Sequence, residues 1–290
     1  MHKFIFIGYY SALSQYLCKH LTAAGNDIKF ITNSASSNNS DGVFRFDEID
    51  ELISKLENKS RNYIVINIAS MVPASCKNIT DYFEVNCSKI PNVIDKLCDQ
   101  LDVSHLLNIS TIDIYSHSEV NINETTPEQP STAYGGSKYW QERLLAEIAK
   151  SHGSRFLTVR APLLIVPGGK NNFIYKWISY FSEGKTVKIT NKDCLFNNFA
   201  DARVIFEIVN KFIENIIMRK KINLAAKDTI TILGLAKAIR KRISGSNSTI
   251  TEVSASKGSQ LISTDTMVNE NLKLYQLLET IDWLLEEQDI

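Results

Sequence analysis

Residues 133–142 read Ala133-Tyr134-Gly135-Gly136-Ser137-Lys138-Tyr139-Trp140-Gln141-Glu142, and they set a phenol and an amine four positions apart. On a helix, positions i and i+4 lie on one face, so Tyr134 and Lys138 can meet over the same site. A nearby ammonium favours the phenolate, so we expect Lys138 to lower the pKa of Tyr134 from about 10 toward the working pH. A tyrosine tuned in this way can serve as general acid and base for a carbonyl and its alcohol.

Two segments upstream of residue 133 complete a characteristic order of sequence motifs. Residues 108–115 form an apolar run that carries two hydroxyls, Ser110 and Thr111, and a polar loop with Glu124 and Pro127 follows it. A strand with Ser/Thr at its end, a Glu-x-x-Pro loop and a Tyr-Gly-x-Ser-Lys helix resemble the extended short-chain dehydrogenase/reductase family, also called the NAD-dependent epimerase/dehydratase family. The resemblance covers most of the chain.

The resemblance implies an α/β fold, namely a Rossmann-like doubly wound parallel sheet with a smaller C-terminal substrate lobe. The dinucleotide-binding domain is expected over residues 1–165, with later segments near 198–220 returning to it, and residues 166–290 should form most of the substrate lobe. The resemblance also implies three catalytic residues. Tyr134 would pass a proton to or from the substrate oxygen, Lys138 would hold the cofactor ribose, and Thr111 would hydrogen-bond the same substrate oxygen.

Composition indicates a soluble globular protein. Of the 290 residues 44% are hydrophobic, which is ample for a packed core, and Lys+Arg and Asp+Glu balance at 32 each. This balance predicts no nucleic-acid partner and no anionic membrane surface. The five cysteines show no C-x-x-C pair and no matching His spacing, so we expect no metal site and no disulfide. No long apolar segment opens the chain, and we predict a cytoplasmic location.

The first strand and its turn carry the signal for a cofactor. Residues 3–8 form a short apolar run that ends at Gly8, and a helical pattern follows it. In the family this turn reads Gly-x-x-Gly-x-x-Gly, which lets the backbone approach the cofactor pyrophosphate. Here the three places hold Gly8, Ser11 and Ser14. We expect a retained cofactor site in which a serine hydroxyl could donate to the phosphates; the alternative is a degenerate fold that binds dinucleotide poorly.

Two further positions bear on which dinucleotide binds. The second apolar run ends at Thr32 and Asn33, where an NAD-specific protein usually places an acid on the ribose 2′-hydroxyl. No acid stands there, which favours NADP(H) over NAD(H), although this segment supplies no Arg. Residues 43–47 are predicted to form the third strand, and its terminal Asp47 matches the family's adenine-side aspartate.

The remaining cofactor contacts follow from the resemblance alone. Ala69, Ser70 and Met71 match the turn after a buried strand, whose backbone passes the cofactor, and Pro162 lies in a segment that resembles the one beside nicotinamide and substrate. Asn86 lies in a segment that resembles the family's Tyr-x-x-Asn-Val helix. It is either a cofactor contact or a structural hydrogen-bonder to a nearby loop, and both alternatives stay open.

The residues after Thr111 bear on the reaction. They are Ile112 and Asp113, whereas the family's 4,6-dehydratases place two acids there, so hydride transfer is favoured over dehydration. The resemblance implies a nucleotide-activated sugar as substrate, although Leu163 replaces an Asn that touches the substrate pyrophosphate in many epimerases. We predict a 4-keto sugar reductase of surface-polysaccharide biosynthesis. A nucleotide-sugar epimerase and a non-catalytic dinucleotide-binding or sensor protein are the alternatives. The helices that bear Asn86 and Tyr134 are expected to form a homodimer interface.

Overall fold

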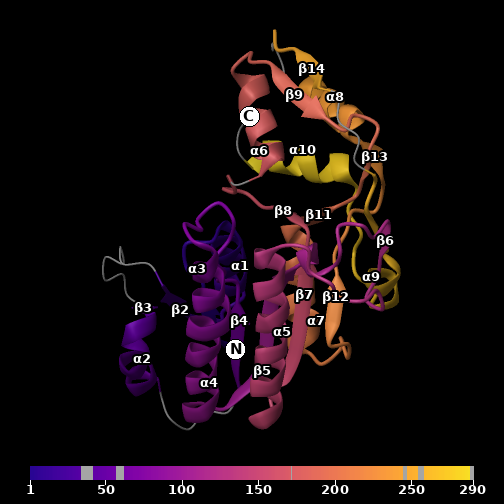
Figure 1. Ribbon diagram of the computed structural model, residues 1–290. Helices are drawn as coiled ribbons and strands as arrows, with labels where there is room; N and C mark the ends of the chain where they lie inside the picture. Colours follow the sequence, from indigo (N-terminus) through magenta and orange to yellow (C-terminus); the bar gives the residue numbers. More distant parts are fainter. Residues whose placement is uncertain (34–41, 57–61, 171, 244–246, 254–257, 288–290) are drawn as a thin grey trace. The chain divides into compact units, whose positions relative to one another are not determined.

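The computed structural model describes residues 1–33, 42–56, 62–170, 172–243, 247–253 and 258–287 (Figure 1). The Ser/Asn-rich residues 34–40 thus lie outside the described part. By internal packing the chain divides into two compact units, which are treated separately. The first unit holds residues 1–116, 127–160 and 206–222, and the second holds residues 117–126, 161–205 and 223–290. The sequence analysis expected a domain boundary at residue 165 and a return of the chain to the first domain near residues 198–220. The division by packing places the loop 117–126 in the second unit, and the chain returns to the first unit at residue 206.

A seven-stranded sheet forms the centre of the first unit within the described residues. Its strands, in spatial order, are β12 (Lys221–Asn223), β7 (Arg155–Ala161), β5 (Val103–Thr111), β4 (Tyr63–Asn67), β1 (Lys3–Ile7), β2 (Asp27–Thr32) and β3 (Val43–Arg45). The neighbouring pairs from β5 through to β3 run parallel. The order turns back at β1, which is the mark of a doubly wound sheet. The predicted fold class is therefore confirmed.

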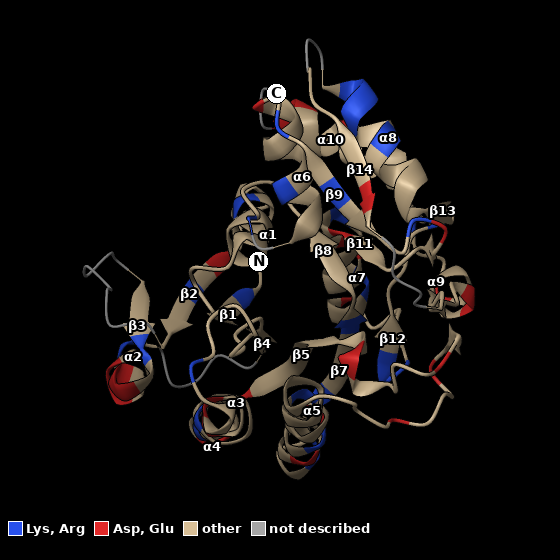
Figure 2. Cartoon of the chain, turned by 45° about the horizontal axis from the view of Figure 1, so that its top comes forward, with Lys and Arg blue, Asp and Glu red and all other residues tan. Residues whose placement is uncertain are grey.

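Helices cover both faces of this sheet, which explains its apolar central strands. All five residues of β4 are buried, as expected of a strand covered on two sides. The helices α4 (Ile90–Gln100) and α5 (Ala133–Ser151) lie on one face, and α1 (Ala12–Ala23) and α7 (Ala202–Ile213) lie on the other (Figures 1 and 2). Apolar side chains of α4 and α5 join those of β1, β4 and β5 in one core cluster.

Short helical segments make further connections in the first unit. They are the 3-10 turn η1 (Phe46–Glu48), α2 (Ile49–Lys55), α3 (Ile79–Phe83), the π-helical segment η2 (Glu84–Lys89) and the 3-10 turn η3 (Ile112–Ile114). A third strand was predicted over residues 43–47. Its predicted end is wrong, because β3 ends at Arg45. There the Arg45 N–H donates to the Glu48 carboxylate at 2.8 Å, which turns the chain into η1 and places Asp47 in that turn.

The second unit is built from two-stranded sheets and helices around its own core. The strand pairs are β6 (Asn121–Ile122) with β15 (Leu261–Ile262), β8 (Leu163–Ile165) with β11 (Phe199–Asp201), β9 (Val187–Thr190) with β14 (Ile250–Val253), and β10 (Leu195–Phe196) with β13 (Ile230–Thr231). The helices are α6 (Phe173–Ser182), α8 (Ile232–Arg242), α9 (Asp265–Asn269) and α10 (Leu277–Glu287). Basic side chains gather on α8 (Figure 2). None of the described helices is both long and apolar enough to cross a bilayer.

Candidate active site

The turn after β1 brings the backbone of Gly8 close to the end of β4. Gly8 has φ +115°, a conformation that side-chain-bearing residues rarely adopt, and a Cβ there would lie 2.8 Å from the Ala69 backbone nitrogen. The β4 exit is held at this point because the Ile68 and Ala69 N–H groups both donate to the Ile7 carbonyl, at 2.9 and 2.8 Å. Gly8 is therefore required by the close approach of these two strand ends.

The two serines of the turn have different positions. Ser14 is fully buried, and its hydroxyl donates to the Gly8 carbonyl at 2.6 Å, so it closes the turn. Ser11 is half-buried at the N-cap position of α1 and, within the described residues, its hydroxyl does not cap the helix. The structure therefore assigns Ser14 to the turn itself and leaves Ser11 as the hydroxyl beside the helix N-terminus, where phosphate groups bind well.

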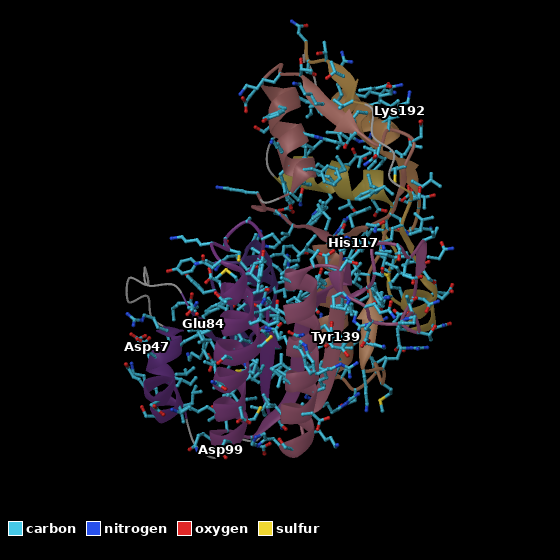
Figure 3. The ribbon with its side chains drawn as sticks, in the orientation of Figure 1. Asp47, Glu84, Asp99, His117, Tyr139 and Lys192 are labelled. Carbon is cyan, nitrogen blue, oxygen red and sulfur yellow. The ribbon has the colours of Figure 1, made fainter. Side chains whose placement is uncertain are left out.

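The edge between β2 and β3 holds a cation that the sequence pattern did not reveal. Strand register pairs Thr32, the buried last residue of β2, with Arg45, the last residue of β3, and the exposed Asn33 follows Thr32. Arg45 Nε donates to Asp47 Oδ1 at 2.9 Å, and a second guanidinium nitrogen contacts the other carboxylate oxygen. This contact lowers the pKa of the Asp47 carboxyl, which lies at the sheet edge in Figure 3. Asp47 is thus an ion-pair partner of Arg45.

The N-terminus of α5 is positioned by a cap and by a glycine contact. The Thr132 hydroxyl accepts the Gly135 N–H at 3.0 Å, as a helix N-cap residue does. A Cβ on Gly135 would lie 2.1 Å from the Asp113 carbonyl oxygen, so only glycine allows this approach to η3. Because η3 follows directly on Thr111, the cap and the glycine bring Tyr134 to the end of β5.

The Tyr134 phenol lies among hydroxyls from two strand ends. Ser70, after β4, and Thr111, at the end of β5, have hydroxyls that favour the Tyr134 phenolate, and the Tyr82 ring lies 5.8 Å from the Tyr134 ring. Burial, with the Asp113 carboxylate nearby, raises the pKa of Tyr134 to about 12, although the Ser70 and Thr111 hydroxyls oppose the shift. The expectation that Lys138 would lower this pKa is not met, because burial of the phenol outweighs the hydroxyls.

Lys138 is buried one helical turn after Tyr134. Its Nζ donates to the Ile109 carbonyl at 3.1 Å and also contacts the side-chain oxygen of Gln141. Burial lowers the pKa of Lys138 to about 8, and the Glu142 carboxylate on the same helix partly opposes this change. Gln141 and Glu142 were not predicted, although their spacing of three and four residues from Lys138 places them on its helix face.

Asn86 makes hydrogen bonds to two segments, the loop after β4 and the helix α5. The Met71 N–H donates to Asn86 Oδ1 at 2.8 Å, and Asn86 Nδ2 donates to the Met71 carbonyl at 3.2 Å and to Ser137 Oγ at 3.0 Å. Gln141 Nε2 donates to the Asn86 backbone carbonyl at 3.1 Å. Of the two alternatives for this residue, the geometry favours the structural one, since its amide ties the loop after β4 to α5.

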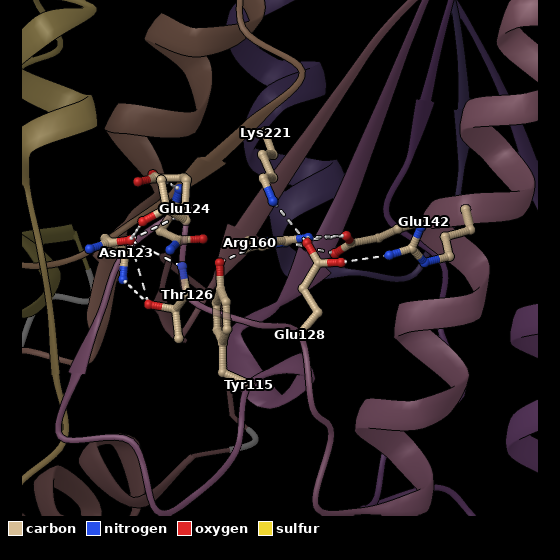
Figure 4. A network of polar contacts seen from close by, with 11 residues as sticks. Tyr115, Asn123, Glu124, Thr126, Glu128, Glu142, Arg160 and Lys221 are labelled. Carbon is tan, nitrogen blue, oxygen red and sulfur yellow. Dashed lines mark hydrogen bonds and ion pairs between the residues drawn. The ribbon is translucent and has the colours of Figure 1, made fainter.

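A buried charge network contacts α5 at Glu142 (Figure 4). Arg160 of β7 is 2% exposed; it donates to Glu142 at 2.6 Å, to the Tyr115 hydroxyl at 2.6 Å and to Glu128 at 2.5 Å. Lys221 of β12 also donates to Glu128, at 2.9 Å. Hydrogen bonds from Lys221 and Arg160 outweigh burial and lower the pKa of Glu128 to about 2. The network therefore links β7 and β12 to the helix that carries Tyr134 and Lys138.

The first unit therefore brings Thr111, Tyr134 and Lys138 together with the loop 69–71 and Asn86. Ser110, the neighbour of Thr111, is buried, and its hydroxyl has no hydrogen-bond partner in the described part of the chain. Pro162 belongs to the second unit.

The second unit contains a cavity of about 450 Å³. The aromatic rings of Phe173, Trp177 and Phe196 line it, together with Lys188 and Asn198. Phe173 lies edge-on to both other rings, with centroids 4.8 Å from Trp177 and 5.7 Å from Phe196. Asn198 Oδ1 is buried without a hydrogen-bond partner among the described residues. Aromatic walls with a few polar atoms are typical of a small-molecule site.

The doubly wound sheet, the glycine turn after β1 and the trio at the end of β5 define the class of Rossmann-like α/β proteins. A family model for the NAD dependent epimerase/dehydratase family matches residues 7–195, and the chain belongs to this family.

Known proteins agree with this assignment. A UDP-glucose 4-epimerase of Lacticaseibacillus casei is 25% identical over 157 residues, so the match spans about half of either protein, 51% of this chain and 47% of the relative. A UDP-N-acetylglucosamine 4-epimerase structure from Bacillus cereus has a TM-score of 0.79 at 19% identity, covering 100% of this chain and 98% of that one. A UDP-glucose 4-epimerase from Thermus thermophilus in complex with NAD has a TM-score of 0.81 at 16% identity, covering 98% of both chains. These two structures share the fold.

Proposed function

We propose that the protein transfers a hydride from a reduced nicotinamide dinucleotide to a keto group of a nucleotide-activated sugar. The observation that carries this proposal is the environment of Tyr134. Its phenol has a pKa of about 12, so it is protonated at neutral pH, and Lys138 follows it by one turn of α5. A protonated phenol is the state that a reductase requires in its proton donor.

The residues of the first unit fit a dinucleotide. Gly8 keeps the tight turn, and because the Ser14 hydroxyl donates to the Gly8 carbonyl, Ser11 is the serine of the turn whose hydroxyl stays at the N-terminus of α1. A bound nicotinamide would supply the hydride. Ser11 and the first N–H groups of α1 would hold its pyrophosphate, Thr32, Asn33 and Arg45 would lie toward the adenosine ribose, and Ala69, Ser70 and Met71 would line the nicotinamide half.

Tyr134, Thr111 and Lys138 would each have a different role in the reaction. Tyr134 donates its proton to the substrate oxygen as the carbonyl becomes an alcohol, so the phenol O–H bond breaks and a new O–H bond forms on the sugar. Thr111 donates a hydrogen bond to the same substrate oxygen. Among the described residues Lys138 contacts Ile109 and Gln141, and a third N–H of its ammonium would hold the ribose.

The cavity of the second unit supports a nucleotide-activated substrate. A nucleobase can stack on the Phe173, Trp177 or Phe196 rings, and a base N–H would satisfy Asn198 Oδ1, which has no hydrogen-bond partner among the described residues. Lys188, the one cation that lines the cavity among the described residues, would attract the diphosphate. We infer a keto sugar of surface-polysaccharide assembly as the rest of the substrate.

The second candidate is a nucleotide-sugar 4-epimerase, which the names of the similar proteins favour. One experiment separates the two. The purified protein is incubated with NADPH or NADH and either dTDP-4-keto-6-deoxyglucose or UDP-4-keto-6-deoxy-N-acetylglucosamine, and nicotinamide absorbance is followed. A reductase consumes the reduced cofactor in proportion to product. If no reduced cofactor is consumed and UDP-glucose is converted to its 4-epimer, the reductase proposal is replaced by the epimerase.

The cofactor proposal makes a prediction about Arg45. We propose that NADP(H) is preferred, because Thr32 and Asn33 supply no acid and strand register adds the Arg45 guanidinium at this edge. Arg45→Met should weaken NADPH binding about tenfold, the effect of losing one charge-assisted hydrogen bond, and leave NADH binding unchanged. Fluorescence titration with both reduced cofactors measures this ratio. Lys29→Met, which removes a cation from the middle of β2, is the matched control. Equal losses for NADPH and NADH would contradict the assignment.

The dimer proposal rests on exposed apolar side chains. Trp140 and Leu144 on α5 are 54% and 38% exposed, and Ile79 and Phe83 of the adjacent α3 are also exposed. We expect dimers at micromolar concentration, and Trp140→Glu should shift sedimentation to the monomer because it buries a charge in the interface. Val120→Glu changes an equally exposed apolar residue of the second unit and should leave the dimer intact. Sedimentation of the unaltered protein as monomer would end this proposal.

A further inference from the structure

The ammonium of Lys138 is held at two points. Its Nζ donates to the Ile109 carbonyl of β5 at 3.1 Å and to the side-chain oxygen of Gln141, on the next turn of α5. An ammonium has three N–H groups in a fixed tetrahedral arrangement, so two held N–H groups set the direction of the third. Lys138 is 1% exposed and Gln141 is fully buried, so water does not compete for their contact.

The side-chain amide of Gln141 is itself fixed in orientation. Its Nε2 donates to the Asn86 backbone carbonyl at 3.1 Å, and its oxygen accepts from Lys138. A carbonyl cannot donate a hydrogen bond and an ammonium cannot accept one, so the reversed amide would satisfy neither partner. Gln141 is thus a neutral acceptor with one allowed orientation, and it holds the Lys138 ammonium without cancelling its charge.

The helix register of η2 makes the Asn86 carbonyl available to Gln141. In this π-helical segment the Ile90 N–H donates to the Val85 carbonyl, five residues back. In the same register the donor to the Asn86 carbonyl would come from Pro91, which has no N–H. Gln141 Nε2 supplies a donor in its place. The contact between η2 and α5 therefore depends on a proline in one segment and a glutamine in the other.

We propose that Gln141 is a positioning residue that keeps Lys138 charged and fixes the direction of its third N–H. This inference rests on the proposed function, in which that N–H holds the cofactor ribose. Burial lowers the pKa of Lys138 to about 8, and a hydrogen bond accepted from the ammonium opposes this effect because it favours the charged form. Without the Gln141 amide, a larger fraction of Lys138 would be neutral at the working pH.

Other ionisable groups in this region do not depend on Gln141. Those that act on Lys138 or on the neighbouring Tyr134 come from four elements: Tyr82 of α3, Cys87 of η2, Asp113 of η3, and Tyr134 and Glu142 of α5. Glu142 and Cys87 act on Lys138 itself, and Glu142 is bonded to Arg160 of β7. Changing Gln141 leaves all of these groups in place, so a shift in the titration of Lys138 can be assigned to the lost amide contact.

The test follows the titration of Lys138 in the full chain. Protein that carries isotope-labelled lysine is titrated by NMR, and the Lys138 Cε resonance is identified by its absence in Lys138→Arg. Gln141→Met has a similar shape but removes the amide, so it should lower the Lys138 midpoint by roughly one pH unit, the shift expected when one hydrogen bond to a charged group is lost. Gln141→Glu keeps an acceptor and adds a negative charge beside the ammonium, so it should raise the midpoint.

The same shift should appear in the reaction. The charged form of Lys138 is required, so kcat/KM should fall as the pH rises through the Lys138 pKa. With reduced dinucleotide and keto sugar, Gln141→Met should move this alkaline limb to lower pH by the same roughly one unit. If the Lys138 midpoint moves and the alkaline limb does not, the role of Gln141 in the reaction is overturned.

Ser137→Ala is the matched control. It removes another buried bond between α5 and Asn86, at 3.0 Å, and leaves the Lys138 contacts in place, so the Lys138 midpoint should not change. An unchanged midpoint in Gln141→Met overturns the proposal. So does an equal fall in Gln141→Glu or in Ser137→Ala, which would show an effect of packing alone. The NMR titration needs neither cofactor nor substrate, so its outcome is separate from failure of the proposed function, which would appear as an absence of dinucleotide binding or of reduction.

Discussion

Replacing Tyr134 by Phe is expected to lower turnover by roughly 100- to 10,000-fold, the range typical of a lost general acid. The substitution keeps the ring, its contact with Tyr82 and the start of α5, but removes the only proton that the ring can donate. Dinucleotide affinity should change little, because the turn at Gly8 and the β2–β3 edge are untouched. Steady-state reduction of the keto sugar and fluorescence titration of the cofactor measure the two quantities.

Tyr82→Phe provides the matched control for this experiment. The two rings are neighbours, with centroids 5.8 Å apart, and both changes delete one phenolic oxygen. The proposed mechanism gives Tyr82 no part in proton transfer, so turnover should stay near that of the unaltered protein. A Tyr134→Phe protein that reduces its substrate at the unaltered rate would eliminate the mechanism, and full turnover without nicotinamide would eliminate the reaction class.

The sequence predicted the local parts of this structure well. These parts are short-range patterns that physical principles connect directly to structure. They are the apolar run of β4, the glycine turn at Gly8 and the i, i+4 pair of Tyr134 and Lys138. The parallel sheet was implied by the family resemblance that these segments carry. The two serines of the turn were harder, because only the structure shows that the Ser14 hydroxyl bonds back to Gly8 and stays out of the phosphate region.

The missed features depend on contacts between distant segments. Arg45 comes next to Thr32 through strand register, and Asn86 bonds Ser137 across about fifty residues of sequence. Neither contact leaves a periodic signal. The direction of the Tyr134 pKa was wrong for a similar reason, because the pattern shows a lysine four residues away but does not show how far burial of the phenol offsets it.

Replacing Arg160 by Met is expected to lower the free energy of unfolding by about 3–5 kcal/mol, the cost of leaving buried carboxylates without their partner. Arg160 is 2% exposed and bonds both Glu142 and Glu128, so its loss leaves Glu142 buried and without this cation. Urea unfolding at neutral pH measures the change. Arg143→Met is the matched control, since Arg143 also bonds Glu128 but is half exposed, and it should cost less than about 1 kcal/mol.

The pH dependence of stability gives the same network a second test. The folded pKa of Glu128 is lowered to about 2, so its ion pairs stabilise the protein fully above the unfolded value and that contribution is lost as pH falls toward 2. Arg160→Met should therefore reduce the slope of stability against pH between about 5 and 2. Adding Glu142→Gln to Arg160→Met should recover part of the lost stability, because it removes a buried charge that has lost its partner. If the double variant is no more stable than Arg160→Met, the destabilisation comes from packing of the arginine side chain and not from the unpaired carboxylate.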